Sequence, residues 1–233
     1  MNLPEIEAFS TTKNITRLRQ NIKKFDGINE RKNWGFYGSE IGSYISNFST
    51  VLPVDLLEFT KGKQNPIIVD LMAPTGTIRS LCEETGIIPE IAIAVSLQDQ
   101  RTQEERDADN ALNIHQLAGN LLDFKTWREL AAMLSGQKSD LIMERAVLGL
   151  IHIPRSKFFY DLALRGLWNI LDENGGLLLA QTHNHNVLRN IGVDFIKWSE
   201  EIAESGVDVC IDPDKRTLML QKNQMFPIDL PKF

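Results

Sequence analysis

The stretch PIIVDLMAPTGTIRSL, residues Pro66 to Leu81, decides the fold of this chain. Its first part, Ile67 to Leu71, is a short apolar run of the kind that forms a buried parallel strand. A turn of small residues follows, and we expect a helix to begin near Gly76. A strand that leads into a helix through such a turn points backbone N–H groups and the positive end of the helix dipole at a ligand. The stretch is therefore the first unit expected of a nucleotide-binding α/β domain.

The rest of the chain repeats this alternation of strand and helix. We expect further strands at residues 91–97, 114–118, 140–144 and 177–182, and then a hairpin formed by 207–211 and 217–221. The segments between them predict helices at residues 77–84, 100–112, 124–134, 156–171 and 187–204. Strict alternation predicts a parallel, doubly wound sheet with right-handed crossovers. The closing hairpin requires that one strand of this sheet run antiparallel.

The length of 233 residues suits one substantial core. We expect a single α/β domain over residues 63–233 and an N-terminal helical extension over residues 1–62. In this extension aromatic side chains, among them Tyr37 and Tyr44, are interleaved with glycines and serines. Two interpretations stay open: a lid over a ligand cleft, whose tyrosines clamp a substrate, or a collar that packs on the sheet.

Composition narrows the classes of partner. A hydrophobic content of 42% and a charged content of 24% are ordinary for a soluble globular protein. The formal net charge of −6 argues against nucleic acid as the main partner. Cys82 and Cys210 have neither metal-ligand nor redox-motif spacing, so we expect buried free thiols. No apolar run approaches membrane-spanning length, and a reducing cytoplasm is the expected location, without a membrane partner.

Five segments carry a family resemblance through their order and spacing. They are Asp70 to Gly76, the end of the second strand at Ser96, Gly119 to Leu121, Asp140 to Leu148, and Leu171 to Leu178. Together they resemble the class I S-adenosylmethionine-dependent methyltransferases over roughly residues 64–222. The resemblance implies a Rossmann-like, seven-stranded doubly wound sheet with an antiparallel last strand. It also implies S-adenosylmethionine as cofactor and S-adenosylhomocysteine as product.

The resemblance assigns cofactor contacts to each segment. The first motif gives Asp70, Met72, Ala73 and Gly76, and the place of the ribose-binding acid falls on Ser96, followed by Leu97. The adenine end and the methionine end of the cofactor are then assigned to three residues, Asn120, Leu121 and Glu144.

The first two motifs depart from the family. Glycine would usually stand where Met72 and Pro74 stand, and glycine alone reaches positive φ without a side-chain penalty. Pro74 also fixes φ and removes an N–H donor. Ser96 lacks the carboxylate that binds the ribose hydroxyls, a loss that Gln98 or Asp99 could compensate.

Candidate catalytic residues follow the fourth and fifth strands. Glu144 could contact the cofactor or an acceptor, or it could form an ion pair with Arg145. His152 and His183 are candidate general bases, because imidazole titrates near neutrality; the alternatives are a packing residue and a polar loop. His183 and His185 have no Cys, Asp or Glu partner at ligand spacing, so we expect no metal.

The leading hypothesis is methyl transfer to a small molecule or to a side chain of a peptide or protein. The alternatives are an inactive methyltransferase-like binding or assembly protein, and a cofactor-binding enzyme with other chemistry, such as cyclisation. A nicotinamide dehydrogenase is disfavoured because the G-x-G-x-x-G turn is absent. The sequence leaves the oligomeric state open between a monomer and a homodimer.

Overall fold

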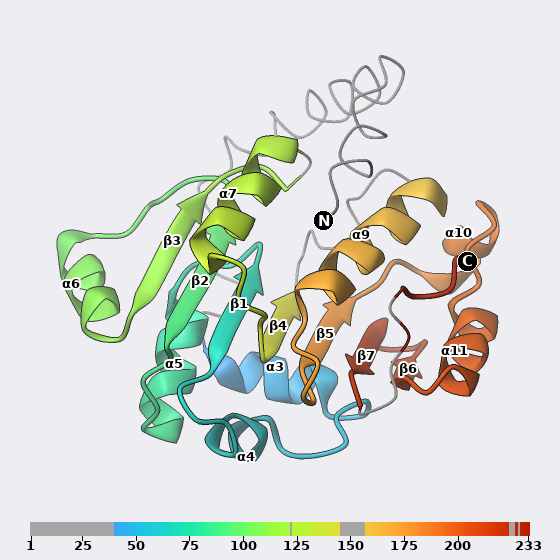
Figure 1. Ribbon diagram of the computed structural model, residues 1–233, viewed down its shortest axis with the longest axis horizontal. Coiled ribbons are helices and arrows are strands. Elements are labelled where there is room, and N and C mark those ends of the chain that lie inside the picture. The colour runs from blue at the N-terminus through green and yellow to red at the C-terminus, as the bar shows by residue number, and fades with distance from the viewer. Residues whose placement is uncertain (1–39, 122, 145–156, 224–226, 228) are drawn as a thin grey trace.

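A mixed sheet organises the described part of the chain. The computed structural model describes residues 40–121, 123–144, 157–223, 227 and 229–233. Within them, the sheet has seven strands in the order β3-β2-β1-β4-β5-β7-β6 (Figure 1). The strands are β1 (Ile67–Leu71), β2 (Ile91–Ser96), β3 (Ile114–Ala118), β4 (Leu141–Glu144), β5 (Leu177–Gln181), β6 (Asp208–Asp212) and β7 (Thr217–Gln221).

The first five strands run parallel, and β7 inserts antiparallel between β5 and β6. This confirms the predicted doubly wound sheet with an antiparallel last strand. The chain winds outward in one direction from β1 through β2 to β3, and in the other from β4 to β5. The switch point therefore lies between β1 and β4, where open α/β sheets bind ligands at the carboxyl ends of their strands.

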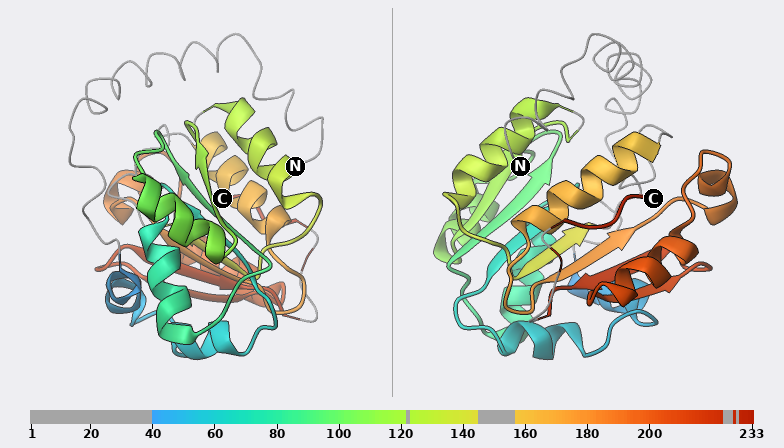
Figure 2. Two further views of the ribbon diagram at one scale, coloured as in Figure 1. Left: turned by 90° about the vertical axis from the view of Figure 1, so that its left-hand side faces the viewer. Right: turned by 45° about the vertical axis from the view of Figure 1, so that its right-hand side comes forward.

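Helices cover both faces of the sheet (Figures 1 and 2). One face packs against α3 (Ile41–Phe48) and α5 (Gly76–Thr85), with α4 (Leu56–Lys61) nearby. The other packs against α7 (Phe124–Leu134), α9 (Lys157–Ile170) and α11 (Phe195–Glu204). Two further helices are α6 (Gln103–Ala111), beside β3, and the short α10 (His185–Arg189).

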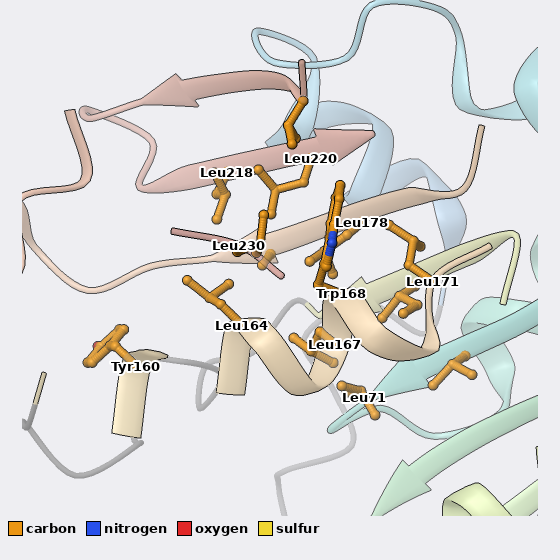
Figure 3. Packing of buried hydrophobic residues seen from close by; sticks show 14 of the residues in the cluster. Leu71, Tyr160, Leu164, Leu167, Trp168, Leu171, Leu178, Leu218, Leu220 and Leu230 are labelled. Carbon is orange, nitrogen blue, oxygen red and sulfur yellow. The ribbon is translucent and has the colours of Figure 1, made fainter. Parts of the chain in front are cut away.

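The strand β1 shows how the sequence produces two cores. All five of its residues are buried, and successive side chains point to opposite faces. Ile68 belongs to the cluster under α3 and α5, whereas Val69 and Leu71 belong to the cluster under α9. Figure 3 shows the α9 side, where Leu164, Leu167 and Trp168 face the sheet.

The C-terminal residues close the α9 and α11 side of the molecule. The indole Nε1 of Trp198 donates to the carbonyl oxygen of Pro231 at 2.7 Å, and that of Trp168 donates to Pro227 at 3.2 Å. The ring of Phe233 lies 4.8 Å, between centroids, from that of Phe195. Two indole donors and an aromatic contact thus hold this segment against the core.

One predicted helix is wrong. We expected a single helix over residues 187–204, but the structure has α10 and α11 there. Gly192 between them has a φ of +79°, which interrupts a right-handed helix. Asp194 then caps α11 by accepting hydrogen bonds from the backbone N–H groups of Ile196 and Lys197.

The described part of the N-terminal segment packs on the sheet. Ile41, Tyr44 and Phe48 of α3 are at most 1% exposed and share a cluster with Ile68. For residues 40–61 the structure thus matches the packing alternative and not the lid. Residues 1–39 of the expected N-terminal extension, with the candidate Tyr37, lie outside the described residues.

The buried lysine of this fold generates a pH-dependent prediction. Lys222 is 4% exposed, and its Nζ donates to the carbonyl oxygen of Leu171 at 2.7 Å and lies 4.8 Å from the Trp168 ring centroid. Burial, with a smaller contribution from Lys138, lowers its pKa from 10.5 to about 8. The folded state therefore binds fewer protons than the unfolded state between these two values, so this group makes the protein more stable as pH rises through that window.

We expect the unfolding free energy of the wild type to rise relative to that of Lys222→Met between pH 8 and 10.5. Urea unfolding of both proteins across this range measures the difference. The variant serves as reference because burial also raises the pKa of Cys82 to about 11, which has the opposite effect on stability above pH 9 in both proteins. A constant difference between the two proteins would contradict the lowered pKa of Lys222.

Candidate functional site

The carboxyl ends of four parallel strands form one row at the switch point. Leu71 of β1 pairs with Val95 of β2 on one side and with Glu144 of β4 on the other, and Glu144 pairs with Ala180 of β5. The loops that follow these residues therefore leave the sheet at one edge. Most of the sequence-predicted site residues lie on this edge or in its loops.

The turn after β1 has a left-handed residue at its start. Met72 has a φ of +64°, and it is the one apolar side chain among the non-glycine residues with positive φ in the described part of the chain. The next residue, Ala73, donates its N–H to the carbonyl oxygen of Val95 at 3.1 Å, which ties the turn to the end of β2. The turn thus has the backbone that glycine would allow, but a methionine adopts it.

The N-terminus of α5 faces this turn. Thr75 is the N-cap residue, but its side chain makes no capping hydrogen bond; its Oγ1 accepts from Nη2 of Arg79 at 3.2 Å. Gly76 begins the helix. The N-cap side chain thus does not cap the first turn of α5, where the positive end of the helix dipole lies.

Asp70 lies one residue before Leu71, the last residue of β1. Its side chain therefore points to the face of the sheet opposite to that of Leu71. It is fully buried, and its Oδ1 accepts a hydrogen bond from the Tyr44 hydroxyl at 2.6 Å. Tyr44 itself is 1% exposed and stacks on Phe48. Asp70 and Tyr44 thus join β1 to α3. The burial of Tyr44 does not fit its predicted role as a substrate-binding residue.

The end of β2 lacks a free carboxylate. The Ser96 hydroxyl donates to the carbonyl oxygen of Gln98 at 2.7 Å and accepts from Nε2 of Gln116 at 3.0 Å. Asp99 accepts three hydrogen bonds from Arg101, at 3.0 to 3.1 Å, and forms an ion pair with Arg106 at 3.0 Å. These hydrogen bonds, led by that from the Arg101 side chain, lower the pKa of Asp99 to about 2.

A carboxylate has about four lone-pair positions, so the Asp99 carboxylate has little acceptor capacity left for a ribose. At this corner only neutral protein groups are therefore left to form hydrogen bonds with a ribose diol. Gln98 is exposed, and its side-chain amide can both donate and accept. Of the two residues expected to compensate for Ser96, Gln98 meets the chemical requirement and Asp99 does not.

The loop after β3 holds the residues assigned to the adenine. Gly119 donates its N–H to the carbonyl oxygen of Ser96 at 2.8 Å, and a Cβ at this position would lie 2.6 Å from Oγ1 of Thr126. This glycine is therefore required for close packing against α7. Asn120 and Leu121 are half-buried, and Leu121 accepts a hydrogen bond from the Trp127 indole at 2.8 Å.

The acceptor side lies after β4 and β5. Glu144 is 3% exposed at the end of β4. Nδ1 of His183 accepts the backbone N–H of Asn184 at 2.7 Å, which places the proton of a neutral ring on Nε2. In this tautomer His183 donates a hydrogen bond and has no free lone pair with which to remove a proton. His152 lies outside the described residues.

Two polar atoms on the acceptor side belong to residues outside the predicted catalytic and binding set. Within the described residues, Oγ1 of Thr182 and Nε2 of His185 are buried and have no hydrogen-bond partner. Burial, followed by the charge of Arg189, lowers the pKa of His185 below 6.5, while Asp194 acts in the opposite direction. His185, two residues from the predicted His183, thus lies in a perturbed environment, which no sequence pattern predicts.

The described residues also bear on the predictions about metal ions, membranes and cysteines. They contain no group of three or more His, Cys, Asp or Glu side chains that could hold a metal ion. No helix among them is long and apolar enough to cross a membrane. Cys82 is a buried free thiol, and Cys210 is a free thiol that is half-buried.

The left-handed residue of the first turn generates a stability prediction. At most positions alanine is more stable than glycine, but at position 72 we expect Met72→Gly to be more stable than Met72→Ala by about 1 kcal/mol, because both lose the same packing and only glycine escapes the steric cost of positive φ. Denaturant unfolding of the two variants measures this. Ala73→Gly is the matched control and should lower stability. An alanine variant as stable as the glycine variant would mean that position 72 is not left-handed in solution.

Known structures are similar to the chain at low sequence identity. No family model matches the chain, and no curated protein sequence matches it. Among solved structures, the chain is similar to a methyltransferase from Geobacter sulfurreducens, with 13% identity, a TM-score of 0.44, and coverage of 78% of this chain and 85% of that one.

Two other similar structures are TrmN from Thermus thermophilus and the MycE methyltransferase of the mycinamycin biosynthetic pathway. The TrmN alignment has 17% identity, a TM-score of 0.43, and covers 72% of this chain and 47% of TrmN. The MycE structure, which contains Mg, SAH and mycinamycin VI, aligns with 9% identity, a TM-score of 0.48, and coverage of 82% and 49%.

The chain thus spans about half the length of TrmN and MycE, and at these identities the likeness concerns the fold alone. The strand order 3-2-1-4-5-7-6, with β7 antiparallel and helices on both faces, carries the assignment. The described sheet thus has the Rossmann-like, doubly wound topology that the sequence resemblance to class I methyltransferases predicted.

Proposed function

We propose that this protein binds S-adenosylmethionine at the switch point and transfers its methyl group to an acceptor. The observation that carries the proposal is the turn after β1, in which a left-handed residue and an α5 N-terminus without a side-chain cap meet at the carboxyl ends of β1 and β4. A non-glycine residue pays a steric cost to hold this backbone, and such strain concentrates at functional sites.

The cofactor would be held by residues of four loops. The backbone of the first turn, at Met72, Ala73 and Gly76, would face its methionine part, together with Glu144 at the end of β4. The adenosine part would lie against Leu97, Gln98, Asn120 and Leu121. Bound S-adenosylmethionine supplies a methyl group that is electrophilic because it is attached to a sulfonium.

The protein's own residues would chiefly orient the acceptor, which is the main requirement of an in-line displacement. His183 is suited to donate a hydrogen bond from Nε2 to an acceptor oxygen, because its Nδ1 is already bonded to the Asn184 N–H. Glu144, buried at the end of the neighbouring strand β4, would contact the amino group of the cofactor or of the acceptor. The Thr182 hydroxyl offers a further polar contact on the same side.

The net charge of the protein bears on the class of methyl acceptor. A formal net charge of −6 supports a small molecule or a peptide or protein side chain over nucleic acid. We further propose that the enzyme acts in the reducing cytoplasm, and that it does so as a monomer or as a homodimer.

A second candidate function is a methyltransferase-like protein that binds partners without catalysis. The observation that favours it is the saturated Asp99 carboxylate at the ribose corner, where Ser96 replaces the family's acid. The two functions differ in one measurable property, the affinity for the cofactor or its product.

Calorimetric titration with S-adenosylhomocysteine distinguishes them. We expect micromolar binding by the wild type and about tenfold weaker binding by Gln98→Ala, because the variant loses one or two neutral hydrogen bonds to the ribose. Gln137→Ala is the matched control, since Gln137 is an exposed glutamine that contacts Glu90 away from the strand ends. No heat at millimolar ligand from folded wild type would contradict the enzyme proposal and favour the second function.

A further inference from the structure

A fully buried acid, Asp109, lies beside the proposed cofactor site without belonging to any of its motifs. It is 0% exposed on α6. Its Oδ1 accepts from Nε and Nη2 of Arg79 at 3.0 and 2.7 Å, and its Oδ2 accepts from Nη1 of Arg101 at 3.0 Å. Both oxygens of one carboxylate are therefore used to hold two different arginines.

Each arginine continues to a loop of the proposed site. Nη2 of Arg79 also donates to Oγ1 of Thr75, the residue that ends the first turn and occupies the N-cap position of α5. Arg101 donates its backbone N–H, Nε and Nη2 to Asp99, in the loop after β2. The carboxylate thus connects the turn after β1 to the loop after β2, two segments that are separate in the sequence.

Stability alone does not explain this network of buried ion pairs. Burying ionised groups carries a desolvation cost, and replacing a whole buried ion network by apolar side chains of similar volume is often neutral or stabilising. What such a network supplies is geometry, since bidentate arginine contacts have a fixed planar fork. Arg79 and Arg101 are 19% and 13% exposed, so solvent does not loosen these contacts as it would on the surface.

We propose that Asp109 is a positioning residue that fixes the first turn and the loop after β2 relative to each other, and so sets the affinity of the site that they form. That the ligand is S-adenosylmethionine rests on the function proposed above; the coupling of the two loops does not. Asp109 touches neither the cofactor nor the acceptor in this proposal and acts through Arg79 and Arg101.

The first test removes the charge and keeps the shape. Asp109→Asn should weaken S-adenosylhomocysteine binding by on the order of tenfold, because the amide holds the two arginines less strongly and the loops lose their shared anchor. Asp107→Asn is the matched control: Asp107 lies on the same helix, is exposed, and contacts only Gln103 among the described side chains. Equal affinities of the two variants would overturn the proposal.

The second test separates positioning from stability. The triple variant Arg79→Met/Asp109→Leu/Arg101→Met replaces the network with apolar side chains, and its unfolding free energy should be equal to or above that of the wild type. Its affinity for S-adenosylhomocysteine should nevertheless stay reduced. Wild-type affinity in this stable variant would show that the network has no positioning role, even if Asp109→Asn alone failed to fold.

The third measurement needs no ligand, and so distinguishes failure of this proposal from failure of the proposed function. Hydrogen exchange of the folded, ligand-free triple variant should be faster than that of the wild type in both residues 72–76 and residues 97–102, with the β1 amides unchanged. Unchanged exchange in both loops would overturn the coupling. Faster exchange in a protein whose wild type binds no S-adenosylhomocysteine would retain the coupling and reject the cofactor.

Discussion

The hydrogen bond from the Ala73 N–H to the Val95 carbonyl oxygen fixes the point on which the site depends. The chain thus leaves β1 while still attached to β2, and the preceding residue, Met72, has a positive φ. The helix α5 then starts at Gly76, and the side chain of its N-cap residue makes no capping hydrogen bond. The loops after β2 and β3 are joined in a similar way, because the Ser96 carbonyl oxygen accepts the N–H of Gly119.

Polar groups around this turn are mostly engaged with one another. Asp70 is bonded to Tyr44, Ser96 to Gln98 and Gln116, and the Asp99 and Asp109 carboxylates to arginines. A charge network of three arginines and two aspartates thus stands beside the corner where the family has one free acid. Because these carboxylates are already engaged, the proposed cofactor would be recognised at this corner by neutral groups and backbone.

The two faces of the sheet serve different purposes. On the α3 and α5 side, the N-terminal helix is fixed by the buried pair Tyr44 and Asp70, so that an aromatic segment before the first strand becomes part of the core. On the α9 and α11 side, the C-terminal segment is held by the indoles of Trp168 and Trp198. The carboxyl ends of the strands, with the loops after β1, β2 and β3, carry the groups available to a ligand.

The sequence by itself determined the strand and helix alternation, the antiparallel hairpin and the place of the first turn, because apolar periodicity and glycine positions are local properties. It missed the break between α10 and α11, since the cost of one glycine in a helix does not decide whether the helix ends there.

Only the tertiary structure decided which polar residues are engaged. That Tyr44 is buried against Asp70 and that Asp109 links Arg79 to Arg101 depend on contacts between residues on different elements. A carboxylate looks the same in a sequence whether it is free or fully bonded; its partners arrive from other loops when the sheet brings the strand ends together.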